Sequence, residues 1–584
     1  MNEIIQEERY LFMNIMTKIG GFCRDYGIWY TLKKVAYRSY IKYYLGKKYC
    51  PLTISEEERK KQSQWIPDKA VKISIVVPLY NTREDFFREM LDSVTDQTYK
   101  DWELCLADAS DDEECSRRLR QITEELSVAD HRIRYQRLKE NHGISENTNR
   151  AIEMSTGDYI ALLDHDDILH PSALFDVMQA INYHQGEFIY TDELSFDGTP
   201  DRVQNIHFKP DFSPESFRSN NYICHFSVFS RYLLEKVGGF QREYDGSQDY
   251  DMLLRLTDEA DNIYHVPKVR YYWRIHAGSV ASSTEAKPYT VEAGRRALEA
   301  HLMRKEIRGN VQSAEGYGPF YRVHYEVPED TRVLVMAETD AVAGELKHSL
   351  KGLPYGIEVY AVNQPRFEVD EKRFDVIVLV RDGYQPEQTG AEWMTELLSC
   401  LMPKENMVAA PVVYDNRGRV YHAGYGYSES RPEQIFSLYR GVPRKDPSYM
   451  YRLAFRQNVS LVGGAVLAVR EDVYSDWVEE NLEVGTLKWN GWGAFSDQTW
   501  FSLCLKAKKR WGDCIYTPYV SFVKKTEAVK SRRQKKSGKQ REHWRMFFAM
   551  WDRMFKKGDP HVNPGMEVFG KYYFLGNDRN TLHF

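Results

Sequence analysis

Short apolar runs that alternate with helical stretches are the feature that most constrains the fold of this chain. Residues 72–78 form a continuous, β-branched run that ends in proline, which is typical of a buried parallel strand. A helical stretch follows at about residues 83–97, and a second apolar run, residues 102–108, ends in an acid. Further βα units continue to residue 163. The alternation predicts an open α/β sheet whose ligands lie beyond the carboxyl ends of the strands.

The same pattern restarts near residue 326. Residues 331–336, 358–363 and 374–382 resemble strands of the first half and keep their order. A length of 584 residues allows two to four domains at about 150 residues each. We therefore predict two related α/β domains, residues 71–325 and 326–584, behind a helical N-terminal extension of residues 1–70.

Composition excludes several classes of protein. Hydrophobic residues make up 42% and charged residues 28% of the chain, which is an ordinary globular balance. The net charge of -6 provides no basic field for nucleic acid, and no apolar run is long enough for a transmembrane helix. The acidic N-terminus does not resemble a secretory signal, and the eight cysteines are scattered without a CxxC pair. We expect a reduced, cytoplasmic protein.

Two basic segments leave alternatives open. Residues 33–48 hold six basic residues and no acid, and Tyr37, Tyr40, Ile41 and Tyr44 recur there at helical spacing. Such a helix could lie on an anionic membrane at the inner face of the cell, or pack against the body with its lysines solvated. Residues 524–541 hold nine basic residues and one acid. They are either a solvated loop or an attachment to anionic lipid or a lipid-diphosphate acceptor; nucleic acid is the weaker third option, because no aromatic residue interrupts the run.

The clearest chemical signal is the acidic end of the strand at residues 159–163. Asp164, Asp166 and Asp167 follow this strand closely, so their charges repel one another. A divalent cation relieves that repulsion, and carboxylate oxygens suit Mg2+ or Mn2+ bridging a diphosphate. The alternative is an acidic loop that caps the next helix.

Other segments could complete such a site. Asp108 ends a strand, where it reaches a bound base or ribose or simply caps the loop. Residues 141–149 open a helix whose N-terminus favours an anion. Residues 246–251 place carboxylates at a helix start, and residues 274–279 supply a cation and an imidazole.

In this order, these motifs resemble those of the inverting family-2 glycosyltransferases of the GT-A fold. The resemblance covers about residues 71–325 and is nearest to bacterial enzymes of surface-polysaccharide, O-antigen and rhamnose-polymer synthesis. The segments that carry it are residues 78–81, 141–149, 157–167, 190–193, 246–251 and 273–276.

The resemblance implies a role for each matching residue. Asp249 would be the general base that takes the proton of the acceptor hydroxyl. Asp166 and His276 would hold Mn2+ or Mg2+, which offsets charge on the leaving nucleoside diphosphate. The implied donor-binding residues are Pro78, Tyr80, Asp108, Asn141, Asn147, Asp164 and Asp192. The implied partners are a UDP- or dTDP-linked sugar and a saccharide or lipid-diphosphate-linked acceptor.

The second domain departs from this pattern. One carboxylate, Asp382, stands where the first domain has three, and Lys524 and Lys525 stand where such domains often carry a histidine. Residues 331–382 are also too few to hold the whole nucleotide-binding segment. These features predict a non-catalytic copy that serves acceptor binding or assembly. The alternative is a second active site, which would make the chain a two-site polymerase.

Two other classes of function compete with a glycosyltransferase. A non-catalytic sugar-nucleotide scaffold is disfavoured by the intact acids Asp164, Asp166 and Asp249. A dinucleotide-dependent oxidoreductase is disfavoured because no G-x-G-x-x-G follows the first strand. The sequence leaves open the donor sugar, the linkage and whether the protein forms a homo-oligomer.

Overall fold

The computed structural model divides the chain into two compact units, each of which is described by itself. The first unit comprises Ile41–Tyr325 with Asn563–Gly565, and the second comprises Met1–Tyr40, Glu326–Val562 and Met566–Phe584. The described residues are 20–21, 23–24, 27–40, 48, 52–276, 288–362, 373–388, 390–427, 434–481, 495–510, 512–525 and 538–567. Most of the basic segment 524–541 lies outside them.

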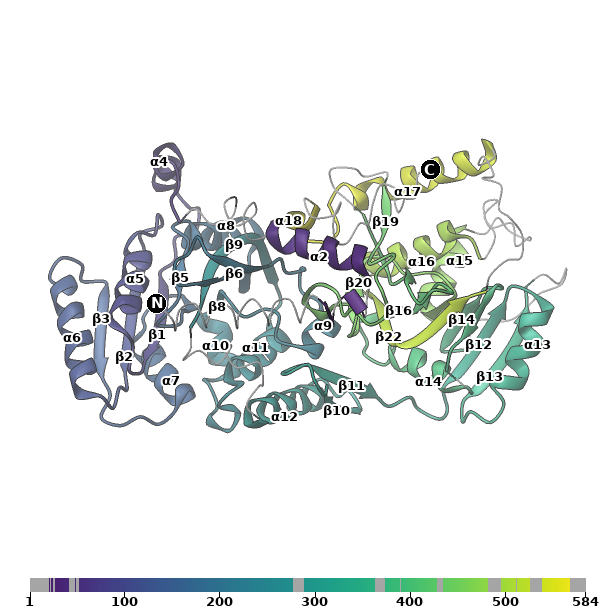
Figure 1. The fold of residues 1–584 in the computed structure, drawn as a ribbon, viewed down its shortest axis with the longest axis horizontal. Helices are drawn as coiled ribbons and strands as arrows, with labels where there is room; N and C mark the ends of the chain where they lie inside the picture. The colour runs from purple at the N-terminus through teal and green to yellow at the C-terminus, as the bar shows by residue number, and fades with distance from the viewer. Residues whose placement is uncertain are drawn as a thin grey trace. The chain divides into compact units, whose positions relative to one another are not determined.

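The first unit is built on a nine-stranded mixed sheet (Figure 1). In spatial order its strands are β3 (Ile133–Arg137), β2 (Trp102–Asp108), β1 (Ile73–Leu79), β4 (Tyr159–Leu162), β8 (Ser227–Ser230), β6 (Phe188–Asp197), β9 (Ile263–Ile275) and β5 (Ile168–Leu169), with β7 (Val203–His207) beside β6. Strands β1 to β4 are parallel to one another, as the alternating pattern predicts. The expected α/β class is confirmed.

Helices connect these strands and cover the sheet. They are α4 (Glu56–Gln64), α5 (Glu84–Thr95), α6 (Glu113–Ser127), α7 (Ile144–Met154), α8 (Ala173–His184), α9 (Pro214–Ser219), α10 (Arg231–Val237), η2 (Arg242–Tyr244), α11 (Gln248–Glu259) and α12 (Pro288–Arg304), and a hairpin of β10 (Gly309–Ser313) and β11 (Tyr321–Tyr325) follows. All seven residues of β1 and of β2 are buried, which is why these strands read as continuous apolar runs. Because β1 and β2 are parallel, their carboxyl ends lie at the same edge of the sheet, where polar loops begin.

The second unit contains another nine-stranded sheet. Its strands, in spatial order, are β13 (Gly356–Ala361), β12 (Arg332–Ala337), β14 (Val376–Val380), β21 (Val466–Arg470), β16 (Asn406–Tyr414), β22 (Asp513–Lys524) and β15 (Tyr384–Pro386), with β17 (Val420–His422) beside β16 and β20 (Gln457–Val459) beside β22. The order from β13 to β15 repeats that from β2 to β5 in the first unit. Within the described ranges no strand corresponds to β3, which accords with the shortness of residues 331–382.

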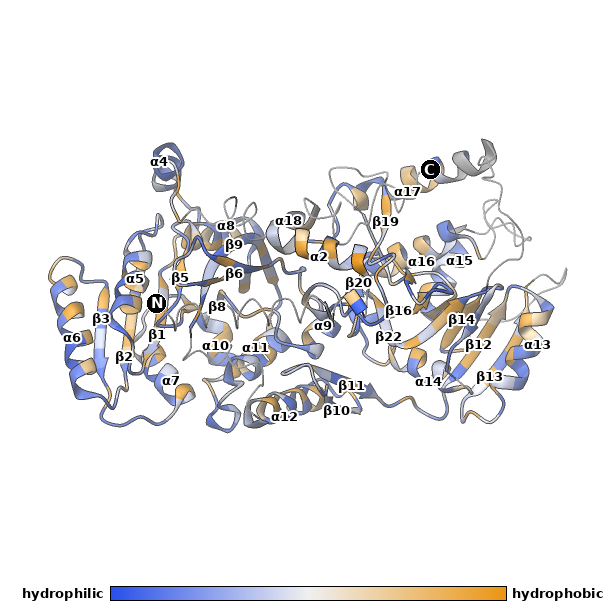
Figure 2. Cartoon of the chain, in the orientation of Figure 1, coloured by the Kyte–Doolittle hydropathy of each residue, from blue (hydrophilic) through white to orange (hydrophobic). Residues whose placement is uncertain are grey.

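The remaining elements complete the second unit. They are α2 (Ile28–Tyr40), α13 (Asp340–Ser349), α14 (Glu392–Ser399), β18 (Tyr425–Tyr427), β19 (Ile435–Ser437), η5 (Tyr449–Tyr451), α15 (Glu471–Asn481), α16 (Asp497–Lys509) and α17 (Gly538–Phe555), and α18 (Pro564–Glu567) contains the boundary between the units. Hydrophobic residues concentrate in the central strands β12 and β14 (Figure 2). Among the described helices, none combines the length and the apolar character needed to cross a membrane.

Candidate active site

The acidic loop after β4 meets the end of β9. The Oδ2 atom of Asp166 lies 2.8 Å from Nε2 of His276, although the two residues are 110 positions apart. Antiparallel pairing of β5 with β9 brings these segments together, because β5 directly follows the acidic loop. Both side chains are partly enclosed, with 17% of Asp166 and 27% of His276 exposed. The structure therefore brings together the two residues that the resemblance implies as metal ligands.

A third acid, Asp167, holds this loop in place. It is fully buried and accepts hydrogen bonds from the backbone N–H of Arg274 at 2.7 Å and from the Tyr271 hydroxyl at 2.6 Å. The guanidinium of Arg274 in turn donates to the carbonyl of Asp166 at 2.7 Å. Asp167 is thus a support for the loop, a role that sequence reasoning did not assign to it.

The carboxylates of Asp164, Asp166 and Asp249 share one electrostatic environment. The pKa of Asp164 is raised, first by desolvation and further by the negative charges of Asp166 and Asp249, while nearby His225 opposes the rise. Since 52% of the Asp164 side chain remains exposed, water moderates this effect. Asp249, in the first turn of α11, accepts a hydrogen bond from the Asn221 amide at 3.0 Å. Three acids from two distant segments therefore surround one polar site.

A buried ion pair supports the segment that carries His225, whose Nε2 lies 4.0 Å from Oδ2 of Asp164. Lys209 is completely buried and its ammonium lies 3.1 Å from Glu193 in β6. The same ammonium donates to the carbonyls of Ile223, at 2.7 Å, and His225. It thereby fixes the segment that carries Asn221 and His225. Sequence reasoning did not assign a role to Lys209, Asn221 or His225, since no local spacing links them.

Burial and charge act in opposite directions on Glu193. Burial by itself raises the pKa of this carboxyl, but the Lys209 ammonium and a hydrogen bond with His207 outweigh it and lower the pKa to about 2. Glu193 is therefore a stable anion in the fold. The backbone N–H of His225 also donates to it.

Two predicted donor-binding residues, Tyr80 and Asn141, lie in the loops that follow β1 and β3. Tyr80 is 42% exposed, and its hydroxyl donates to Asp111 at 2.9 Å. Asn141 accepts hydrogen bonds from the Gly143 N–H at 3.0 Å and from the Asn147 amide at 2.9 Å. These contacts organise the loop that opens α7. The side chains of Tyr80 and Asn141 remain accessible to a ligand.

Four predicted donor-binding residues are buried within the protein: Pro78, Asp108, Asn147 and Asp192. Pro78 is buried within β1. Asp108 is fully buried, and both its oxygens accept hydrogen bonds from the hydroxyls of Ser110, Ser116 and Tyr135. These donors lower the pKa of Asp108 against the effect of burial. Asp108 therefore holds in place the segment that follows β2, through its hydrogen bonds with Ser110 and Ser116.

Asp192 is also enclosed. It is fully buried and accepts hydrogen bonds from Nε2 of His265 and the backbone N–H of Lys209, both at 2.9 Å. The amide of Asn563, which belongs to the same unit, donates to both its oxygens at 3.0 and 2.9 Å. Its neighbour Glu193 makes the contacts with His225 on the site side. Consecutive strand residues point to opposite faces, so these two acids have different surroundings.

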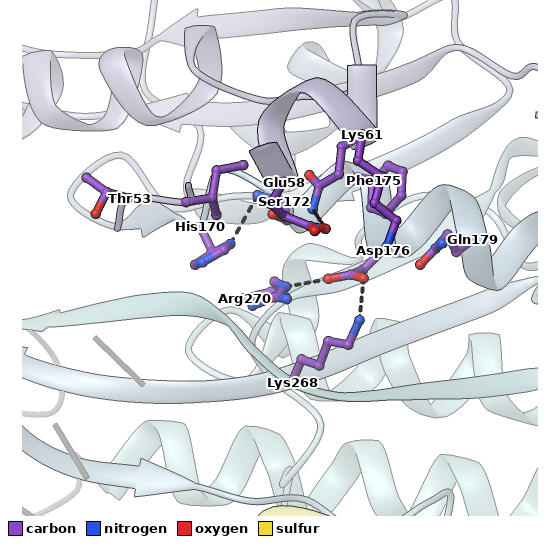
Figure 3. A pocket seen from close by; sticks show the side chains of 12 residues that line it. Thr53, Glu58, Lys61, His170, Ser172, Phe175, Asp176, Gln179, Lys268 and Arg270 are labelled. Carbon is purple, nitrogen blue, oxygen red and sulfur yellow. Dashed lines mark hydrogen bonds and ion pairs between the residues drawn. The ribbon is translucent and has the colours of Figure 1, made fainter. Parts of the chain in front are cut away.

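A cavity of about 420 Å³ lies between α4, α8 and β9 (Figure 3). Two of its lining cations, Lys268 and Arg270, bind the same carboxylate, Asp176, at 2.6 and 2.5 Å. None of the predicted donor-binding, metal-binding or catalytic residues lines it. The acidic loop remains the candidate active site.

Comparison with known proteins finds one family model that matches part of the chain. The model described as "Glycosyl transferase family 2" matches residues 74–238, which include the acidic loop, Tyr80 and Glu193. Residues 74–238 are therefore similar to a family 2 glycosyltransferase domain. The match supports the GT-A type of α/β fold for the first unit.

Two relatives and one solved structure are also similar to parts of this chain. The chain is 31% identical to the uncharacterized protein y4gI of Sinorhizobium fredii, over 87% of this chain and 59% of y4gI. It is 34% identical to the O-antigen biosynthesis protein RfbC of Myxococcus xanthus, over 45% of this chain and 20% of RfbC. The S. aureus TarS 1-349 structure with UDP-GlcNAc is 21% identical over 40% of this chain and 66% of TarS 1-349, with a TM-score of 0.33. The chain spans less than two thirds of these first two relatives.

Proposed function

We propose that this protein transfers a sugar from a nucleoside-diphosphate donor, UDP- or dTDP-linked, to a saccharide or lipid-linked saccharide, with inversion, in the synthesis of a bacterial surface polysaccharide. The observation that carries the proposal is the meeting of Asp166, His276, Asp164 and Asp249 at the sheet edge of a family 2 domain. The name of the relative RfbC supports the polysaccharide context.

Asp249 is proposed as the general base. Its position at the start of α11 leaves one carboxylate oxygen for an acceptor hydroxyl while Asn221 binds the other at 3.0 Å. Orientation by the Asn221 amide keeps that free oxygen directed at a fixed position. When Asp249 takes the proton of the acceptor hydroxyl, the acceptor oxygen becomes a stronger nucleophile. Its attack on the anomeric carbon from the side opposite the leaving group inverts that carbon.

The side chains at the acidic loop fit a divalent metal. Asp166 and His276 direct an oxygen and a nitrogen at each other across 2.8 Å, and both atom types bind Mn2+. Within the described ranges no set of three His, Cys, Asp or Glu side chains is arranged for a metal. Two protein ligands leave room for water and donor phosphates, which is the usual arrangement for Mg2+. When bound, the metal would neutralise charge on the leaving diphosphate.

A donor screen tests this function. The full chain is incubated with UDP- and dTDP-linked sugars and a saccharide acceptor, and nucleoside diphosphate release is measured with and without Mn2+. We expect Mn2+-dependent release in the wild type, and its loss in Asp166→Asn and Asp249→Asn. Asp201→Asn, at an exposed carboxylate of the same unit, is the matched control and retains release.

The two variants separate the two roles. Asp166→Asn is expected to weaken Mn2+-dependent donor binding in calorimetry, whereas Asp249→Asn retains donor affinity, because a base acts in the transition state. Unchanged turnover in either variant would contradict its assignment.

Helix α2 supports a proposed attachment to anionic membranes. The hydroxyl of Tyr30 and the ammonium of Lys34 bind Asp446 at 2.5 and 2.7 Å, which fixes one face of the helix. The opposite face exposes Ile28, Trp29, Leu32 and Val35 by 42–83%. The side chains of the predicted aromatic face, Tyr37, Tyr40, Ile41 and Tyr44, lie outside the described residues.

Vesicle flotation tests this attachment. Trp29→Ser with Leu32→Ser should reduce flotation of the full chain with anionic vesicles, since both apolar side chains would lose their place in the interface. Tyr232→Ser, at a side chain 67% exposed in the first unit, serves as the control. Equal flotation of all three proteins would refute the attachment.

The second unit is proposed as non-catalytic. Its Asp497 begins α16, but the carboxylate forms an ion pair with Arg381 at 2.8 Å. Arg381 therefore occupies the carboxylate that a general base would present to an acceptor hydroxyl. We therefore expect Asp497→Asn to retain most transfer activity. Product chains that stop after one sugar in this variant would instead establish a two-site polymerase.

A further inference from the structure

Strand register identifies which residue of the second unit occupies the position of Asp164. Tyr159 in β4 and Val376 in β14 are equivalent, because each pairs with the last residue of its antiparallel neighbour, β8 or β21. Asp164 lies five residues after Tyr159 (164 − 159 = 5), and Arg381 lies five residues after Val376 (381 − 376 = 5). A cation therefore stands where the first unit has an acid.

Arg381 also changes the charge of its surroundings. Its guanidinium pairs with Asp497 at 2.8 Å and lies 4.1 Å from the ring centroid of Trp500. The side chain is only 14% exposed, and its Nε atom has no partner among the described residues. The second unit thus holds a partly buried ion pair, with 14% of Arg381 and 38% of Asp497 exposed, where the first holds the mutually repelling Asp164 and Asp249.

Two further cations share one aromatic ring. The ammonium of Lys524, at the end of β22, lies 4.5 Å from the ring centroid of Tyr421 and donates to its hydroxyl at 2.9 Å. The guanidinium carbon of Arg440 lies 4.7 Å from the same centroid. Neither cation pairs with a carboxylate of the described residues. Their mutual repulsion favours an anion beside them, as the acids of the first unit favour a cation.

The second unit also lacks the acid that corresponds to Glu193 of the first unit, which makes the surroundings of Arg381 and Arg440 less negative. His207 in β7 faces Glu193 in β6 and forms a 3.2 Å contact with it, whereas the equivalent His422 in β17 faces Val413 in β16. His422 is fully buried, and neither ring nitrogen has a partner among the described residues. Burial, followed by the charges of Arg381 and Arg440, lowers the pKa of His422 to about 3. The imidazole is therefore neutral, with a donor and an acceptor to spare.

We propose that Arg440 and Lys524, with Arg381 behind them, bind a diphosphate group without a metal ion at the carboxyl edge of the second sheet. A guanidinium matches phosphate oxygens with two parallel donors, and an ammonium adds a compact charge. Two cations that have no carboxylate partner among the described residues suit a small anion of more than one negative charge. Such a group occurs in nucleoside diphosphates and in lipid diphosphates.

Isothermal titration of the full chain with inorganic pyrophosphate, in excess EDTA, tests the proposal. The wild type should bind, and Arg440→Ala and Lys524→Ala should each weaken binding by about tenfold or more, the effect of one charge-assisted hydrogen bond. Lys347→Ala removes the same charge from an exposed position on α13 and should bind like the wild type. Both altered side chains are only partly buried, and unchanged thermal unfolding would show that the variants fold.

The outcomes separate this site from the one in the first unit. Asp166→Asn should keep pyrophosphate binding in EDTA, so failure of the proposed transferase activity leaves this test intact. No binding by the wild type in EDTA, or equal weakening in Lys347→Ala, would overturn the proposal.

Competition with bound pyrophosphate identifies the source of the diphosphate. Stronger displacement by UDP points to a nucleotide, and stronger displacement by farnesyl diphosphate points to a lipid-linked ligand; either result supports the site. If neither compound displaces pyrophosphate, the proposal is wrong.

Discussion

Lys209→Met should be among the most damaging single substitutions in the first unit. Lys209 is fully buried, and its ammonium binds Glu193 at 3.1 Å and two backbone carbonyls. Removing one partner of a buried pair leaves an uncompensated charge, which costs about 3–5 kcal/mol. For a unit of this size that corresponds to roughly 6–20 °C in the midpoint of thermal unfolding.

Lys236→Met is the matched control. Lys236 pairs with Glu259 at 2.7 Å, but both side chains are nearly half exposed, at 44% and 45%. Solvent screens such a pair, so its loss should change the midpoint little. Calorimetry of the full chain measures both variants. Equal shifts in the two would refute the reasoning that burial makes the Lys209 contact valuable.

Acidification provides an independent check. The folded pKa of Glu193, about 2, lies below the ordinary value of about 4.3 for an unfolded glutamate. Its contribution to stability is therefore complete above pH 4.3 and is lost as the pH falls towards 2. In Lys209→Met this acid-dependent loss should become smaller, because the cation that lowers the pKa is gone.

Two further predictions concern the loops at the sheet edge. Tyr135→Phe removes a 2.6 Å donor to the buried Asp108 and should lower the unfolding free energy by about 2 kcal/mol in denaturant titration; an unchanged midpoint would contradict the supporting role of Asp108. Gly143→Ala should cost about 1–3 kcal/mol, because Gly143 has φ +98° and a Cβ there would lie 2.5 Å from Oδ2 of Asp245. Wild-type stability of this variant would show that the loop moves freely.

Local patterns were sufficient for the sheet elements. The runs at residues 72–78 and 102–108 became β1 and β2 within a residue, because strands buried on both faces need continuous apolar side chains. The repeated order of strands in the second half was also readable, since each strand carries its own pattern. The acids after β4 were recognisable for the same reason: they directly follow an apolar run.

Pairwise contacts between distant segments could not be read in this way. The 2.8 Å contact of Asp166 with His276 depends on the pairing of β5 with β9. The ion pair of Lys209 with Glu193 joins residues from different segments, and nothing in the local sequence marks this lysine. The family resemblance supplied the first contact and not the second.

The sequence by itself determined the α/β class and the acids at the strand ends, because each follows from residues that are neighbours along the chain. Only the tertiary structure decided that Asp192 is buried against His265 while the adjacent Glu193 meets His225, since strand register and the alternation of faces assign each side chain its surroundings. It likewise placed Arg381 at the position of Asp164. The charge environment of each of these side chains depends on residues that strand pairing brings together from distant parts of the chain. It therefore cannot be read from any single segment of the sequence.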